Sequence, residues 1–141
     1  MESSPGCWQV YGEVLAREYA RSALRPAYRL AVDSYAVQHP GWRSDQATLS
    51  VCVHLLRLCL VVERGADVDD AARAARAALR RKERFVWLTP PRSLGRVTVA
   101  DVAAASTRFE HQRRVLAWAD SAWSAWTEHH AVVRGWLSGA G

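Results

Sequence analysis

The sequence predicts an all-α protein, a single helical domain over residues 1–141 with four main helices and one or two short ones. Three observations support this. Apolar residues recur at intervals of three and four along most of the chain, which is the spacing of one helix face. Residues 49–62 are apolar on almost every side, as in a buried helix, and the run is too short to span a bilayer. With five prolines and eight glycines, the chain has few turns.

The first two helices have recognisable boundaries. Ser4 and Pro5 suit the first turn of a helix that fades over residues 20–24. The second helix begins near Pro26 and ends before Pro40, because proline keeps the residue before it out of helical geometry. The apolar face predicted for the first helix consists of Trp8, Tyr11, Leu15 and Tyr19.

The third and fourth helices are marked by their caps. Ser44 or Asp45 caps the third helix, which extends to Arg64 and stops at Gly65. Asp67 caps the fourth, which continues to about residue 83. Its alternating alanine and arginine leave little apolar surface, so we expect a peripheral position.

The last part of the chain combines an irregular segment with two helices. Two adjacent prolines and a glycine forbid regular structure over residues 85–97. Thr98 with Asp101 predicts a capping box for a short helix. A single long helix is then expected from Thr107 to Leu137. The predicted buried stripe of this helix is His111, Val115, Trp118, Ala122, Trp126, His129, Val133 and Trp136.

The charge of the chain is +5, carried by eighteen arginines and one lysine. A solvated basic surface is the simpler interpretation of this charge, and nucleic-acid binding is the weaker alternative. That alternative would use one face of the fourth helix, formed by Arg73, Arg76, Arg80 and Arg84.

The three cysteines predict a reducing environment. Cys52 and Cys59 are seven residues apart on one helix, about 10 Å along its axis, which exceeds disulfide reach. Three is also an odd number for a disulfide framework. No segment has the order of a signal peptide. We therefore expect free thiols, a cytoplasmic location and no membrane association.

Six segments of the chain match one known pattern: residues 4–8, 11–19, 32–41, 53–60, 98–102 and the tryptophan series from 118 to 136. Together they resemble the DUF5946 family, small and mostly actinobacterial proteins known as a domain of unknown function. Family members often carry a Cys-Pro-x-Cys-Gly knuckle upstream of the first segment, and this chain starts after that point. The resemblance therefore implies a fold, and neither an activity nor a zinc knuckle.

A polar cluster in the middle of the bundle is the candidate catalytic site. Glu13, Asp33 and His54 each lie near the middle of a predicted helix, and antiparallel helices would bring them to one level. Asp33 interrupts an apolar stripe, and an unpaired buried charge is costly, so we expect His54 to be its partner. The other predicted pocket residues are Tyr35, His39, Arg57, His111, Trp118, Trp126, His129 and His130.

Two carboxylates and an imidazole in a tryptophan-lined pocket could transfer protons or hold a divalent ion. However, the five histidines lack metal-binding spacings such as H-x-x-x-H, so we predict no metal ligands. The leading hypothesis is a small-molecule-binding protein, with acid–base or metal-assisted chemistry as its extension. One alternative is a purely structural cluster with Arg57 as counter-ion. Another is a non-catalytic homodimer formed through the last helix. The sequence identifies no reaction, substrate or cofactor.

Overall fold

Helices make up the regular structure of the computed structural model, which describes residues 5–19, 25–81 and 84–138. No strand occurs in these ranges, so the all-α prediction is confirmed, with somewhat more helices than the four main and one or two short ones predicted. The elements are α1 (Pro5–Tyr19), α2 (Arg25–Gln38), α3 (Asp45–Leu58), a π-helical turn (Cys59–Glu63), α4 (Val68–Arg80), α5 (Val99–Ala103), α6 (Arg108–Ala125), a 3-10 turn (Thr127–His129) and α7 (His130–Ser138).

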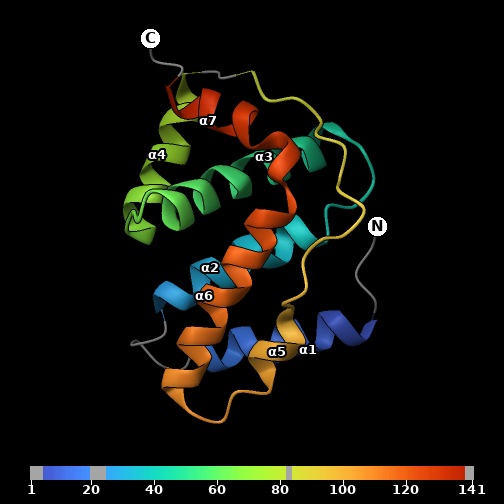
Figure 1. Ribbon diagram of the computed structural model, residues 1–141, viewed down its shortest axis with the longest axis vertical. Coiled ribbons are helices and arrows are strands. Elements are labelled where there is room, and N and C mark those ends of the chain that lie inside the picture. The colour runs from blue at the N-terminus through green and yellow to red at the C-terminus, as the bar shows by residue number, and fades with distance from the viewer. Residues whose placement is uncertain (1–4, 20–24, 82–83, 139–141) are drawn as a thin grey trace.

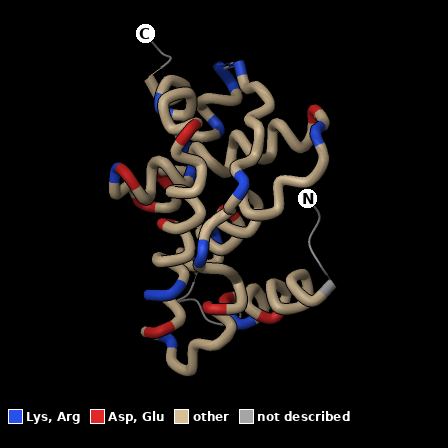
Figure 2. The backbone as a smooth tube through the Cα atoms, turned by 45° about the vertical axis from the view of Figure 1, so that its right-hand side comes forward, with Lys and Arg blue, Asp and Glu red and all other residues tan. Residues whose placement is uncertain are grey.

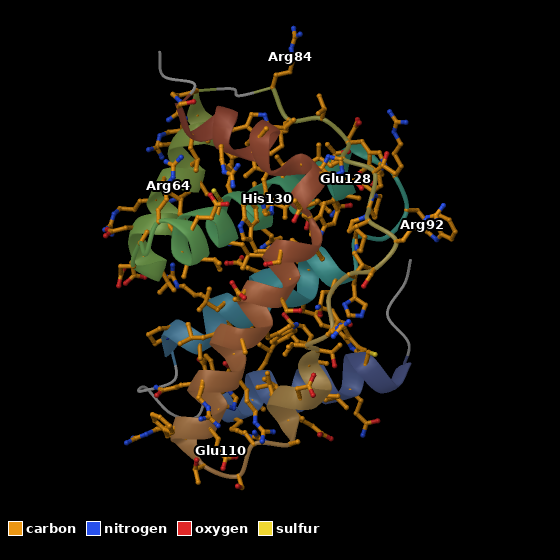
Figure 3. All side chains as sticks on the ribbon, viewed as in Figure 1. Arg64, Arg84, Arg92, Glu110, Glu128 and His130 are labelled. Carbon is orange, nitrogen blue, oxygen red and sulfur yellow. The ribbon has the colours of Figure 1, made fainter. Side chains whose placement is uncertain are left out.

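The pair α2 and α6 forms the centre of the molecule (Figure 1). α1 packs against α5 and α2 at one end, and α3 packs against α4 and α7 at the other. Residues 84–97 run along the outside from the α4 end to the α5 end, as the irregular segment predicted from the prolines. Arg84 and Arg92 extend outward from this segment (Figure 3).

α3 is buried along one face. Leu55, Leu56 and Leu58 are fully buried, whereas Leu49 is 46% exposed. The helical run of residues 45–63 is long and apolar enough to cross a membrane by composition. The central helix of a soluble bundle has the same composition, and α3 packs against α2, α4, α6 and α7.

The helix caps follow the predicted pattern. The Ser44 side chain accepts a hydrogen bond from the backbone at the start of α3, and Asp67 does the same for α4. Thr98 and Asp101 form the predicted capping box of α5. Gly65 ends the third helix with a φ of 65°, which is the left-handed conformation that glycine adopts without strain. The predicted cap at Ser4 and the end of the fourth helix near residue 83 lie outside the described residues.

The predicted face of the first helix is wrong in part, because Tyr11 is buried as expected but Trp8 and Tyr19 are not. Trp8 and Tyr19 are 63% and 82% exposed. The face that packs on α5 and α2 instead contains Tyr11, Val14 and Glu18. These positions also have helical spacing. However, one of them is a glutamate, so a search for regularly spaced apolar residues does not identify this face.

The predicted continuous last helix is also wrong, because it breaks between α6 and α7. The side chain of His130 hydrogen-bonds to the carbonyl oxygen of Trp123 at 2.8 Å, and the Thr127 hydroxyl donates to the carbonyl of Ser124. Side chains thus occupy carbonyls that a continuing helix would use for its own backbone. Trp126 leaves helical geometry at this point, with ψ of 24°.

Charged residues are spread over the molecule. Figure 2 shows arginines at the top and at the bottom of the molecule, with aspartate and glutamate interspersed. Of the four arginines predicted to form one basic face, Arg73 pairs with Asp70, Arg76 lines a cavity and Arg84 belongs to the irregular segment.

Candidate functional site

Asp33 and His54 face each other across α2 and α3. The Oδ1 atom of Asp33 lies 2.6 Å from Nδ1 of His54 and 3.5 Å from Nη1 of Arg57. Asp33 is 3% exposed, so its charge depends on these two partners. Nδ1 of His54 donates its hydrogen to Asp33, and Nε2 lies on the other edge of the ring with no described partner.

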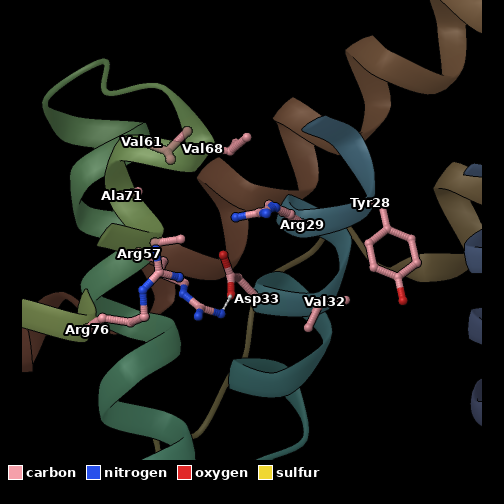
Figure 4. A pocket seen from close by; sticks show the side chains of 10 residues that line it. Tyr28, Arg29, Val32, Asp33, Arg57, Val61, Val68, Ala71 and Arg76 are labelled. Atoms are coloured by element: carbon pink, nitrogen blue, oxygen red, sulfur yellow. Dashed lines mark ion pairs between the residues drawn. The ribbon is translucent and has the colours of Figure 1, made fainter. Parts of the chain in front are cut away.

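Asp33 also lines a cavity of about 280 Å³ between α2, α3 and α4, here called the Asp33 pocket (Figure 4). Besides Tyr28, its walls are apolar side chains and arginines. The apolar residues are Val32, Val61, Val68, Ala71 and Ala72, and the arginines are Arg29, Arg57 and Arg76. No tryptophan is among these described lining residues, so the prediction of a tryptophan-lined pocket is wrong.

The three arginines of the Asp33 pocket differ in their partners. Arg29 pairs with Asp69 at 3.3 Å on the surface. Arg57 contacts Asp33, while its own Nε is buried without a hydrogen-bond partner. Arg76 makes no hydrogen bond or ion pair with another described residue. Figure 4 shows the side chains of Arg57 and Arg76 extending from α3 and α4 into the same space beside Asp33.

Glu13 does not join this cluster. It is exposed on α1 and has no hydrogen bond or ion pair to Asp33 or His54 among the described contacts. The physical reason is the orientation of α1 about its own axis, which turns Val14 and Glu18 into the core and Glu13 toward the solvent.

Glu18 is the buried acid that sequence reasoning missed. Its carboxyl oxygen lies 3.0 Å from Nε2 of His111, and both side chains are at most 1% exposed. The angle between them falls outside hydrogen-bond geometry, so both groups lack a described hydrogen-bond partner at these atoms. Burial raises the pKa of Glu18 to about 8, and the nearby positive charge of Arg17 opposes this rise. Burial also lowers the pKa of His111, and Arg17 lowers it further. Both shifts favour the uncharged forms of the two side chains.

Trp118 and Trp126 belong to the core. Both are fully buried, and their indole nitrogens donate to the side chain of Gln38 at 2.7 Å and to the carbonyl of Val37 at 3.2 Å. These bonds attach α6 to α2. The two indoles therefore serve packing and do not line the Asp33 pocket.

Tyr35 and His39 occupy a different place on α2. Tyr35 stacks between Tyr11, at 3.9 Å between ring centroids, and His39, at 4.0 Å. The Nδ1 atom of His39 lies 3.0 Å from the carbonyl of Tyr35. His39 also lines a second cavity of about 490 Å³, together with Cys7, next to the start of α5.

Glu63, the last residue of the π-helical turn, organises a further cluster at the junction of α6 and α7, where Figure 3 labels His130. Arg134 donates to both of its carboxyl oxygens, and the indole of Trp123 donates at 3.2 Å. His130 stacks on Trp123 with centroids 3.7 Å apart and places Nδ1 3.8 Å from Glu63. The Arg134 hydrogen bonds lower the pKa of Glu63 to about 2, so this carboxylate stays ionised. The sequence signal for this cluster is the pair of residues 130 and 134, one turn apart on α7.

The five histidines are dispersed over separate surroundings. His129 bonds to the carbonyl of Thr89 at 2.8 Å, apart from the sites of His54, His39, His111 and His130. Among the residues described, no group of three or more histidine, cysteine, aspartate or glutamate side chains could hold a metal ion. No disulfide joins the described cysteines, and burial raises the pKa of Cys52 to about 12 and of Cys59 to about 11.

Comparison with known proteins gives one match. A family model described as "Family of unknown function (DUF5946)" matches residues 1–127. No curated protein and no solved structure matches the chain.

Proposed function

Because the chain belongs to the DUF5946 family, whose function is unknown, we propose from the geometry alone that it binds a small molecule in the Asp33 pocket. The observation that carries the proposal is a buried carboxylate with two polar partners on the wall of a cavity. A cluster that only fixed helix register would gain nothing from such a cavity, because empty space beside a buried charge is costly.

The cavity suits a small ligand. Its volume of about 280 Å³ lies at the lower end for ligand pockets. Apolar walls from α2 and α4 with a few converging polar groups are the usual composition of such sites. We infer a ligand of metabolite size, held by Asp33 and Arg57.

Acid–base chemistry is the finer form of this hypothesis. His54 is not among the lining residues, so we assign it a positioning role through its hydrogen bond to Asp33. Proton transfer would require a substrate atom within hydrogen-bond reach of Asp33 or of Nε2 of His54. The free thiols of Cys52 and Cys59 fit a cytoplasmic location, which we also propose.

The test is a fragment screen by ligand-observed NMR on the wild type and on Val61→Phe, which fills the Asp33 pocket. We expect fragment signals that are lost in Val61→Phe and kept in Val132→Phe, a control on an exposed position of α7. Asp33→Asn should weaken the same fragments while the protein remains as stable as the wild type or more so. A loss of about 1–3 kcal/mol without any binding defect would instead identify a structural cluster.

Self-association is the second candidate function. Phe109 and Leu116 are 70% and 58% exposed, and their spacing of seven places them on one face of α6. Trp8 and Trp42 are also exposed, and exposed aromatic residues are enriched in interfaces. Sedimentation velocity over a range of concentrations, with Leu116→Lys as the variant, distinguishes a homodimer from a monomer.

A further inference from the structure

We propose that the ligand of the Asp33 pocket carries an oxyanion, a carboxylate or a phosphate monoester, bound between Arg57 and Arg76. This inference rests on the proposed function and specifies its ligand class. It concerns the arginines of the pocket, whereas the proposed function rests on the buried acid and the cavity.

The first argument is the charge of the walls. Three arginines and one carboxylate line the pocket among the described residues. Arg29 is already paired with Asp69, outside the pocket. Arg57 pairs with Asp33, the one carboxylate among the described lining residues, and Arg76 has no ion-pair partner among the described residues, which leaves an excess positive charge beside apolar walls. Low surrounding dielectric strengthens the attraction of such a site for an anion.

The second argument is unused hydrogen-bonding capacity. Arg57 contacts Asp33 through Nη1, and its buried Nε has no hydrogen-bond partner. The Arg57 side chain is 29% exposed and lines the pocket, so its guanidinium N–H groups that do not face Asp33 can donate to an acceptor in the pocket. The planar guanidinium group presents its N–H groups in a fork that fits two oxygens of a carboxylate or phosphate.

The third argument concerns the size and polarity of the part of the ligand that is not the anionic group. The remaining wall consists mainly of valine and alanine side chains from α2, the π-helical turn and α4. These favour a short apolar body beside the anionic group, and a volume of about 280 Å³ suits a group no larger than a small metabolite.

The test compares three probes at constant ionic strength: inorganic phosphate, butyrate, and butyramide as the neutral analogue of butyrate. Binding is followed by amide chemical shifts of α2, α3 and α4. We expect saturable binding of phosphate or butyrate at least tenfold tighter than that of butyramide. The stronger of the two anions identifies the headgroup. Arg76→Gln should weaken the anion at least tenfold, while Arg80→Gln, on the same helix but outside the described lining of the Asp33 pocket, should not.

The outcomes separate this inference from the proposed function. If fragments occupy the pocket but the anions bind no better than butyramide, the oxyanion inference fails and the proposed function stands. If neither fragments nor anions bind, both fail. Equal losses in Arg76→Gln and Arg80→Gln would show attraction by general surface charge and would also overturn the inference. Circular dichroism of both variants confirms that each is folded.

Discussion

The carboxyl group of Glu18 illustrates how one residue can carry a pH dependence. It is fully buried, lies beside the imidazole of His111, and has no described hydrogen-bond partner. Burial raises its pKa from 4.5 to about 8, so between these values the folded chain holds a proton that the unfolded chain has lost. The stability of the fold therefore decreases as the pH rises through this window. His111, whose pKa is lowered, acts in the opposite sense below about pH 6.5.

We predict that Glu18→Gln removes most of this decline, because glutamine does not ionise. Wild type should lose on the order of 2–4 kcal/mol of unfolding free energy between pH 5 and pH 8, and the variant much less. Urea unfolding at several pH values measures both slopes, with Glu13→Gln on the exposed side of α1 as the matched control. Parallel slopes for wild type and Glu18→Gln would mean that Glu18 is already ionised in the fold.

The acids of the candidate site show what a sequence can predict about single residues. Asp33 was predictable because it interrupts an apolar stripe, and a buried acid needs a partner of suitable chemistry. Glu13 was not a reliable choice, because its burial depends on how α1 is rotated. Tyr11, Val14 and Glu18 form an equally regular stripe, and contacts with α5 and α2 decide which stripe is buried.

At the scale of elements, helix starts were predictable and the α6–α7 break was not. The caps at Ser44, Asp67 and Thr98 are local hydrogen bonds, so their residue types indicate them directly. The break depends on His130, whose side chain reaches the carbonyl of Trp123 and stacks on the same residue. The predicted stripe from His111 to Trp136 continues through the break and remains largely buried. The spacing of its residues therefore did not indicate the break.

We predict that His130→Ala destabilises the protein by about 1–3 kcal/mol, because the Trp123 carbonyl loses its side-chain partner in a buried setting. His129→Ala is the matched control, since His129 also bonds to a carbonyl but lies in more exposed surroundings. We expect the control to cost less than about 1 kcal/mol. Chemical denaturation measures both. Equal costs would show that the junction is held by Arg134 and Glu63 rather than by His130.

At the scale of the whole molecule, the fold class followed from periodicity, but the composition of the pocket did not. Arg29 and Arg76 reach the same cavity from α2 and α4, because both of these helices contact α3 and each other. Helix pairing of this kind depends on long-range packing, which single-helix patterns do not encode. The arginines of α4 therefore looked like one solvated face in the sequence.

Gln38 connects three parts of the molecule at the end of α2. Its amide nitrogen donates to the carbonyls of Leu94 and Val97 at 2.9 and 2.8 Å, and its oxygen accepts from the indole of Trp118. Gly95 passes close by with φ of 106°, and an added Cβ would come within 2.8 Å of the Ser121 hydroxyl. The irregular segment is thus fastened onto the central pair α2 and α6.

We predict that Gln38→Ala costs about 3 kcal/mol of unfolding free energy, because the buried Trp118 indole and two carbonyls lose their partner together. Gln46→Ala, on an exposed position of α3, should stay within about 0.5 kcal/mol of wild type. Urea unfolding gives the two costs, and hydrogen exchange shows where protection is lost. If the segment is an integral part of the fold, amides of α2 and α6 should lose protection together with those of residues 94–97. Loss confined to residues 94–97 would mean that the segment detaches without weakening the bundle.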